Sequence, residues 1–249
     1  MRYLALLVAF VVVMSAGICV SAAESPAPGK QVEQTLEISD AASVAYLLYL
    51  PKAYQPDNKK WPLMLFLHGR GESFGPLQAV KKWGPPRMVE RGDEFPYILV
   101  SPQCPPGHYW SDVKQQSRVL QLLDVITKTY AVDKNRLYLT GLNMGGDGTW
   151  RLVADNPRRF AAAVPICGIG VPEDAYRLAK LPIWVFHGDQ DRSVPIERSV
   201  EMVKAIRASG SKKIRFTTLE GIGHNSWSSA YAPPDLYKWL KGQTASRNR

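Results

Sequence analysis

The chain has 249 residues, of which 45% are hydrophobic and 21% are charged, and its formal net charge is +9. This apolar content is sufficient for a packed core and excludes a disordered chain. The basic residues come as scattered pairs, such as Lys59-Lys60 and Lys212-Lys213, without a basic helix or interleaved aromatic residues. The charge therefore predicts a basic surface rather than a nucleic-acid-binding protein.

The N-terminus resembles a secretory signal peptide. Arg2 is followed by an apolar run from Leu4 to Val20, and then by the small residues 21–23. This order predicts a signal peptide over residues 1–23 that is cleaved near Ala22 or Ala23. The mature protein is then expected to be secreted or periplasmic, without stable membrane insertion. The apolar run is slightly long, so an uncleaved membrane anchor is the alternative.

The rest of the chain is expected to form a flexible leader (24–30), one domain (31–243) and a C-terminal tail (244–249). Residues 32–50 alternate and are rich in β-forming residues, which predicts an N-terminal β-hairpin. Nearly uniform apolar runs follow, and they are typical of parallel strands buried on both faces. These runs are 63–67, 97–100, 137–140, 161–166 and 183–186, and the more alternating 214–219 predicts a strand near the sheet edge.

Helical patterns separate these runs. Apolar residues recur at helical spacing over 119–130 and over 200–206, and Gly210 is placed to end the latter helix. A short helix is expected over 147–155, before Asn156-Pro157. Strands that alternate with helices predict an α/β fold, with a mostly parallel sheet covered by helices on both faces.

The most informative turn is Gly141-Leu-Asn143-Met-Gly-Gly, after the run 137–140. Strand, sharp turn and helix in this order are typical of the nucleophile elbow G-x-S-x-G, in which the central residue carries the reactive side chain. Here the central residue is Asn143. Asn is among the few non-glycine residues that tolerate a positive φ, so the elbow geometry is still expected.

Three other turns carry polar groups to the same edge of the sheet, beyond the carboxyl ends of the strands. The segment 68–72, His-Gly-Arg-Gly-Glu, is expected to aim the N–H of Arg70 at a developing oxyanion, with the N–H of Met144 as the second donor. Asp189 and Asp191 lie on the next turn, and His224 on the last. The order of position 143, acid and histidine is that of an α/β-hydrolase.

Metal and cofactor motifs do not compete with this interpretation. The four histidines are far apart in the sequence and none forms a metal-ligand spacing, so neither a metal nor an organic cofactor is expected. Cys104 and Cys167 remain after cleavage, and export would permit a disulfide between them. Two separately buried thiols are the alternative.

On these segments the chain resembles secreted bacterial α/β-hydrolases, in the neighbourhood of phospholipase/carboxylesterases, dienelactone hydrolases, feruloyl-type esterases and the "predicted peptidase" group related to prolyl oligopeptidase. The resemblance covers about residues 44–240. It implies carboxylic-ester hydrolysis of a small-molecule ester, with His224 as base and Asp191 rather than Asp189 as acid. It also implies that Trp110 and Trp227 line the substrate pocket, with packing as the alternative for each.

The resemblance fails at position 143, where the family has Ser. An amide nitrogen is not basic and is no useful nucleophile, so activity is expected to be strongly reduced. Three hypotheses follow. In the first, Asn143 was introduced, or arose recently, in a working esterase. In the second, the chain is a pseudoenzyme that binds an acyl or aromatic-ester ligand without cleaving it. In the third, Asn143 deamidates to a nucleophilic Asp. The sequence leaves acyl specificity, alcohol specificity and oligomeric state open.

Overall fold

The computed structural model describes residues 26–39, 42–57 and 59–245. The predicted signal peptide, the first two residues of the leader and the last four residues of the tail therefore lie outside the described residues. No helix in the described part of the chain is long and apolar enough to cross a membrane.

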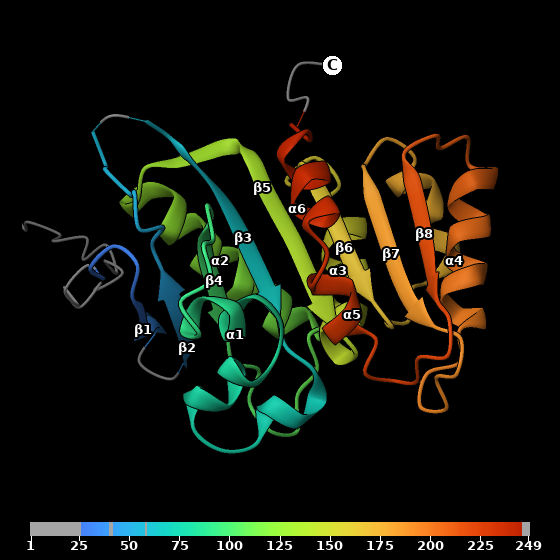
Figure 1. Ribbon diagram of the computed structural model, residues 1–249, viewed down its shortest axis with the longest axis horizontal. Helices are drawn as coiled ribbons and strands as arrows, with labels where there is room; N and C mark the ends of the chain where they lie inside the picture. The colour runs from blue at the N-terminus through green and yellow to red at the C-terminus, as the bar shows by residue number, and fades with distance from the viewer. Residues whose placement is uncertain (1–25, 40–41, 58, 246–249) are drawn as a thin grey trace, which may run out of the picture.

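The described strands form one sheet, shown in Figure 1. Its order is β1-β2-β4-β3-β5-β6-β7-β8. β1 and β2 are antiparallel, as are β2 and β4, whereas all neighbours from β4 to β8 are parallel. The strands are β1 (Gln31–Ser39), β2 (Ala42–Tyr49), β3 (Trp61–Leu67), β4 (Ile98–Pro102), β5 (Val132–Leu142), β6 (Ala162–Ile166), β7 (Ile183–Gly188) and β8 (Ile214–Leu219).

The predicted hairpin and the mostly parallel sheet are confirmed, and β8 lies at the sheet edge as expected. The largest difference in bounds is in β5, which begins at Val132 rather than at Leu137. Val132 pairs with Trp61 of β3, but the polar residues 133–136 follow it and interrupt the apolar run. Because these residues are polar, the sequence pattern did not indicate the first half of this strand.

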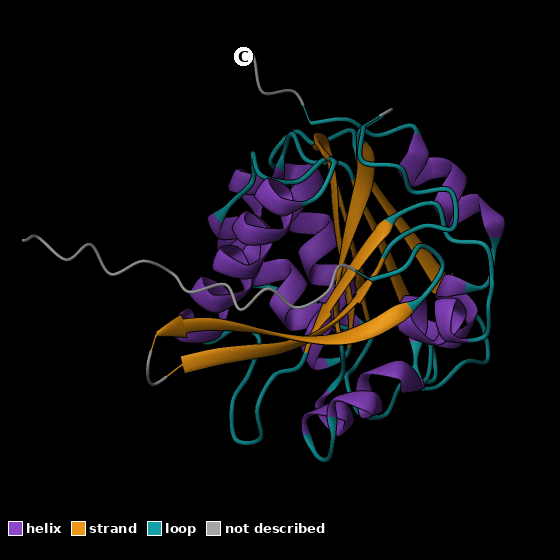
Figure 2. Ribbon diagram, turned by 90° about the vertical axis from the view of Figure 1, so that its left-hand side faces the viewer, coloured by secondary structure: helices purple, strands orange, loops and turns teal. Residues whose placement is uncertain are grey.

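Helices cover both faces of the sheet, as Figure 2 shows with the sheet seen nearly edge-on. One apolar core lies under α2 (Val113–Thr129), α3 (Met144–Asp155) and α4 (Glu197–Ala208). The other lies under α1 (Gly84–Glu90), α5 (Trp227–Tyr231) and α6 (Pro234–Lys241). The 3₁₀ helices are η1 (Arg70–Ser73), η2 (Leu77–Lys82) and η3 (Pro172–Leu178).

Three residues with open predictions lie in these cores, Cys104 and Trp110 in the first and Cys167 in the second. Cys104 and Cys167 are both free and buried, so the disulfide alternative does not hold. Trp110 is only 1% exposed, and its indole N–H donates to the carbonyl of His68 at 3.0 Å. The expectation that Trp110 lines the substrate pocket is corrected, since its ring packs edge-on against His68 inside the core.

Helix α3 begins three residues earlier than predicted, directly after Asn143. Its first turn contains Gly145 and Gly146, which are poor helix formers, and the sequence therefore placed the start of the helix after them. The structure explains the glycines. A Cβ on Gly145 would overlap the backbone carbonyl of Leu67 at the end of β3, so no larger residue fits where this helix meets the sheet.

We expect Gly145→Ala to lower the free energy of unfolding by about 3 kcal/mol or more, because a methyl group there must displace backbone rather than a flexible side chain. Gly71→Ala is the matched control. Its Cβ would meet nothing within 4 Å and its φ is not positive, so a change below about 1 kcal/mol is expected. Urea unfolding followed by circular dichroism measures both, and equal stability of the two variants would contradict this explanation.

Candidate active site

Loops at the carboxyl edge of the sheet bring the predicted site residues together. Arg70 follows β3, Asn143 follows β5, Asp191 follows β7 and His224 follows β8. A chain of hydrogen bonds connects them from Arg70 through Asn143 and His224 to Asp191. Residues separated by up to 154 positions in the sequence thus share one site, as the parallel sheet predicts.

The backbone of Asn143 has the expected elbow conformation. Its φ is 52° and its ψ is −119°, in a region that few non-glycine residues adopt. Its N–H donates to the carbonyl of Ile166 at 3.0 Å, and its own carbonyl accepts from the N–H of Asp147 at 3.1 Å. These bonds hold the strained residue between β6 and the first turn of α3, so its side chain points to the loops beyond the sheet.

The side-chain amide of Asn143 bridges the two groups that would act on a substrate. Its Oδ1 accepts the backbone N–H of Arg70 at 3.1 Å, and its Nδ2 lies 3.0 Å from Nε2 of His224. The amide NH₂ is a donor only, so Nε2 of His224 accepts and Nδ1 carries the ring proton. Met144 is the first residue of α3, and its N–H therefore has no partner within the helix.

Asp191 holds the other side of the imidazole. Its Oδ2 accepts from Nδ1 of His224 at 2.7 Å, and its Oδ1 accepts the amides of Ser193 and Val194 at 2.8 and 2.9 Å. Burial raises the pKa of this carboxyl, but the hydrogen bonds from His224 and the two amides outweigh burial and leave the pKa below its usual range. Asp191 is thus an anion at neutral pH.

The two aspartates differ in the groups that they contact. Asp189 is exposed, and its Oδ1 accepts the backbone N–H of Gly221 at 2.8 Å. It therefore braces the loop that precedes His224, whereas Asp191 bonds the imidazole itself.

His187 supports Asp191 and was not assigned a role from the sequence. Its Nε2 lies 2.9 Å from the carbonyl of Val194 and 3.2 Å from Oδ2 of Asp191, and both partners are acceptors. Its Nδ1 accepts from the hydroxyl of Ser199 on α4 at 2.8 Å. His187 lies near the end of β7, just before the turn that carries Asp189 and Asp191, but only the fold shows that its ring lies against the carboxylate of Asp191.

His68, directly after β3, is a second buried histidine near the elbow. Its Nδ1 donates to the carbonyl of Gly69 at 2.6 Å, and its Nε2 accepts the N–H of Cys104 at 2.9 Å. Burial lowers the pKa of this imidazole to about 4. His68 is therefore neutral and fixes the loop that presents the N–H of Arg70.

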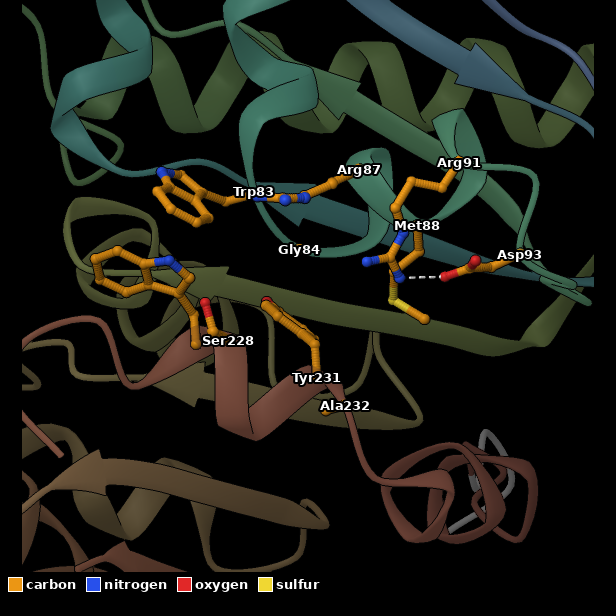
Figure 3. A pocket seen from close by; sticks show the side chains of 10 residues that line it. Trp83, Gly84, Arg87, Met88, Arg91, Asp93, Ser228, Tyr231 and Ala232 are labelled. Carbon is orange, nitrogen blue, oxygen red and sulfur yellow. Dashed lines mark hydrogen bonds and ion pairs between the residues drawn. The ribbon is translucent and has the colours of Figure 1, made fainter. Parts of the chain in front are cut away.

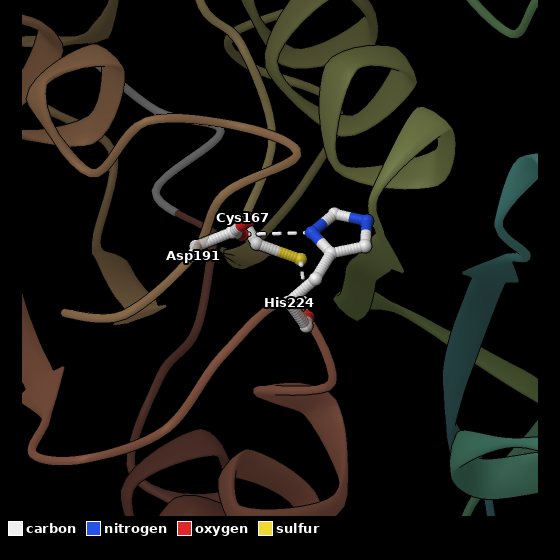
Figure 4. Close-up of side chains that lie close together, drawn as sticks. All are labelled: Cys167, Asp191 and His224. Carbon is white, nitrogen blue, oxygen red and sulfur yellow. Dashed lines mark hydrogen bonds and ion pairs between the residues drawn. The ribbon is translucent and has the colours of Figure 1, made fainter.

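One cluster offers three atoms of the types that bind metals. Sγ of Cys167, a carboxylate oxygen of Asp191 and a ring nitrogen of His224 lie within 4.8 Å of one another, as Figure 4 shows. No spacing in the sequence indicates this grouping. Asp191 and His224 already use these atoms for their 2.7 Å hydrogen bond, and burial raises the pKa of the Cys167 thiol to about 12. The cluster therefore fits a hydrogen-bonded site better than a metal centre.

A cavity of about 390 Å³ lies between α1 and α5, and Figure 3 shows its walls. It is lined by Trp83, Arg87, Met88, Trp227 and Tyr231, among others. Trp227 connects the cavity to the site, since its ring lies edge-on to His224 with centroids 5.3 Å apart. Trp227 thus lines a cavity beside His224, and that this cavity is the substrate pocket stays a prediction.

Asp147, one turn into α3, is a second buried carboxyl that the sequence did not single out. Its Oδ1 accepts the N–H of Ile169 at 2.6 Å, which ties the helix to the loop after β6. Burial raises the pKa of Asp147 to about 6, although hydrogen bonds and nearby His224 oppose the rise.

This pKa predicts a pH-dependent cost to stability. An unfolded Asp titrates near 4, so between about pH 4 and 6 the folded chain binds more protons and the free energy of unfolding falls as pH rises. Asp147→Asn should be more stable than the parent by about 2 kcal/mol at pH 7, with the difference vanishing near pH 4. Urea unfolding of both proteins at several pH values measures this difference. The titration of His68 contributes equally to both proteins and therefore cancels. A pH-independent difference would contradict the prediction.

Fold and site together define an α/β-hydrolase. Over residues 108–230 the chain matches the dienelactone hydrolase family. It is thus related to carboxylic-ester hydrolases, in agreement with the resemblance seen in the sequence.

Several known proteins that resemble this chain are esterases. The chain is similar to a thermostable esterase of known structure, with 34% identity and a TM-score of 0.75 over 86% of this chain and 63% of that one. It is 28% identical over 147 residues to the bifunctional acetylxylan esterase/xylanase XynS20E of Neocallimastix patriciarum, which covers 58% of this chain but only 21% of that protein. A feruloyl esterase module from Clostridium thermocellum, solved with sinapinate, shares the fold at 19% identity, with a TM-score of 0.64 over 87% of this chain and 88% of the module.

Proposed function

We propose that the site binds carboxylic esters and is built for their hydrolysis, with Asn143 in the position of the nucleophile. The observation that carries the proposal is the hydrogen-bond chain from Arg70 through Asn143 and His224 to Asp191. In a hydrolase of this type, Nε2 of His224 accepts the proton of the nucleophile and later returns it to the leaving alcohol. The anion of Asp191 stabilises the imidazolium, and the N–H groups of Arg70 and Met144 bind the oxyanion.

Asn143 satisfies the geometry of this machinery but not its chemistry. Its Nδ2 donates to Nε2 of His224 as a serine hydroxyl would, yet its lone pair is delocalised and attacks no ester. Its Oδ1 also uses the N–H of Arg70, so an ester carbonyl must displace the amide before it can bind there. Both effects support strongly reduced hydrolysis in the chain as it stands.

The cavity between α1 and α5 is the candidate for the acyl group. It adjoins His224 through Trp227, and its volume of about 390 Å³ lies within the usual range for small-molecule sites. Trp83 and Trp227 supply an apolar surface for an aliphatic or aromatic acyl chain.

A non-catalytic ester-binding protein is the second candidate. The observation that favours it is that Asn143 completes the hydrogen bonds of Arg70 and His224, so nothing in the site is left unpaired by the substitution. In that case the parent chain would bind an ester without turnover.

The test is to introduce Asn143→Ser and to assay p-nitrophenyl esters from acetate to octanoate together with a p-nitroanilide. We expect hydrolysis of the esters, with little hydrolysis of the anilide. Silence of the serine variant on every ester would overturn the esterase proposal, whereas a faster rate on the anilide would replace it with a peptidase.

A further inference from the structure

Basic side chains gather at the edge of the sheet where the parallel strands begin, which we call the amino edge. The segments before β3, β6, β7 and β8 lie together there, at the top of Figure 1 and opposite the edge that holds His224. The end of α6 reaches the same edge, because Lys241 lines a cavity together with Lys60. The exposed cations of these segments are Lys59, Lys60, Arg158, Lys180, Lys212, Lys213 and Lys241.

These seven cations lack carboxylate partners. None of them forms an ion pair within the part of the chain that the structure describes. Arg136 at the same edge shows the contrast, since it pairs with Asp133 at 2.6 Å. The exposed carboxylates of Asp57 and Glu94 precede β3 and β4, but the free cations outnumber them. The amino edge therefore carries an excess of positive charge.

Two cavities lie at the amino edge. One, of about 240 Å³, is lined by Lys60 and Lys241 among others, and the other, of about 480 Å³, by Lys180 and Lys213 among others. None of the described residues that line either cavity is an aspartate or a glutamate. An anionic group placed there meets cations without a competing carboxylate, so the charges of these cavities match an anionic partner.

The side chains at this edge favour a partner that is recognised by its density of charge. Trp61, Tyr97 and Tyr138 line the smaller cavity but are at most 4% exposed, so their rings offer no face on which a nucleobase could stack. Six of the seven cations are lysines. A lysine acts as a point charge, whereas arginine provides the fork that binds one fixed phosphate or carboxylate.

The N-terminal segment joins the domain at the same edge. The N–H of Gly29 donates to the carbonyl of Leu50 at 2.8 Å, directly after β2. Tyr49 at the end of β2 pairs with Leu99 near the start of β4, which places this contact at the amino edge. Lys30 adds a further exposed cation there. An N-terminal apolar segment that enters a membrane, whether as a signal peptide or as an anchor, therefore leaves the amino edge nearest to that membrane.

We propose that the amino edge is a docking surface for the anionic phospholipids of a membrane, and that the docked protein turns its candidate active site away from the lipid. The lysines lie against the headgroup phosphates, whose negative surface potential attracts clustered basic residues. Large exposed apolar side chains are found elsewhere: Phe74, Tyr109 and Ile169 lie on segments that follow β3, β4 and β6. Docking is therefore electrostatic and is reversed by salt.

Lysine labelling on vesicles tests the proposal with the full chain, because it reads the amino edge itself whether or not the N-terminal segment is retained. The protein is mixed with vesicles of phosphatidylglycerol or of phosphatidylcholine and treated with an amine-acylating reagent, and peptide mass spectrometry follows each lysine. We expect phosphatidylglycerol to slow the labelling of Lys180, Lys213 and Lys241 at least about fivefold. Lys82 and Lys114, exposed on segments that follow β3 and β4, should react at an unchanged rate. Phosphatidylcholine should protect none of these lysines, and about 1 M salt should abolish the protection.

Paired variants assign the docking to the amino edge rather than to net charge. Lys59→Gln with Lys60→Gln removes two charges at the smaller cavity, and the effect is read at Lys213 in the larger one. The docking constant, taken as the protection factor of Lys213 minus one, should fall about 25-fold, which corresponds to about fivefold for each lysine near an anionic surface. Lys82→Gln with Lys114→Gln is the matched control, because it removes the same charge from the other edge. It should leave the docking constant within about twofold. All four substituted side chains are exposed, so folding is not at risk.

Several results would overturn the proposal: no protection on phosphatidylglycerol, equal protection on phosphatidylcholine, protection of Lys82 and Lys114 to the same degree, or equal losses in the two double variants. Polygalacturonate and polyuridylate are compared with the vesicles at equal concentrations of charge. Stronger protection by either polymer would replace the membrane with a soluble polyanion as the partner.

Discussion

Asn143→Ser is expected to raise the turnover of p-nitrophenyl acetate by up to about six orders of magnitude, the loss seen when serine proteases lack their nucleophile. The elbow holds position 143 at a φ of 52°, and the side chain already lies 3.0 Å from Nε2 of His224. A serine placed there needs no rearrangement of the backbone. The substitution also frees the N–H of Arg70, which Oδ1 of Asn143 accepts at 3.1 Å.

Two further substitutions separate the hypotheses for position 143. Asn143→Ala removes both side-chain hydrogen bonds without supplying a nucleophile and should stay at the parent rate. Asn143→Asp has the side chain that deamidation of the parent would produce. If the amide is stable, intact mass spectrometry of the parent should show no gain of about one dalton at this residue. Turnover by the parent at the rate of the serine variant, with Asn143 intact, would contradict this account.

Asp191→Asn, introduced together with Asn143→Ser, is expected to lower turnover about 10⁴-fold, as in serine proteases whose triad aspartate becomes asparagine. Asp191 accepts from Nδ1 of His224 at 2.7 Å, and Nε2 of the buried His187 lies 3.2 Å from the same carboxylate oxygen. An amide at this position removes the negative charge that stabilises the imidazolium. It also turns one oxygen into a donor, which favours the wrong tautomer of His224.

Asp189→Asn is the matched control, because it changes the same atoms two residues earlier on the same turn. Its Oδ1 accepts the N–H of Gly221 at 2.8 Å, and an asparagine keeps that oxygen. We expect it to lower turnover less than about tenfold, as for a surface substitution that acts through a loop. Steady-state kinetics of both double variants measure the contrast, and equal losses would show that Asp191 is not the acid.

The order of elements could be predicted from the sequence because uniform apolar runs identify parallel strands. Such runs mark β3, β6 and β7, and the alternating residues of β1 and β2 mark the hairpin. The bounds were less predictable where local polarity and packing disagree. The first half of β5 was not predicted because its residues are polar. The first turn of α3 was not predicted because helix propensity disfavours Gly145, although close backbone packing requires a glycine there.

The convergence of Asn143, Asp191 and His224 could be predicted because each lies on a turn after its own strand, and their order is informative. The supporting residues could not. His187, Asp147 and Cys167 acquire their roles from contacts across the fold, and no spacing in the sequence indicates these contacts. Trp110 shows the reverse error, because its nearness to matching segments suggested a pocket residue and the fold buries it.

The central claim is that residue 143 occupies the position of the nucleophile in an otherwise complete hydrolase site. Labelling with a fluorophosphonate tests it most directly, because this reagent reacts only with a serine activated by a neighbouring base. We predict that Asn143→Ser gains one adduct per chain, located by peptide mapping at residue 143, and that the parent and the further variant with His224→Ala gain none. Equal labelling of the parent, or an adduct at Ser226, Ser228 or Ser229, would contradict the account.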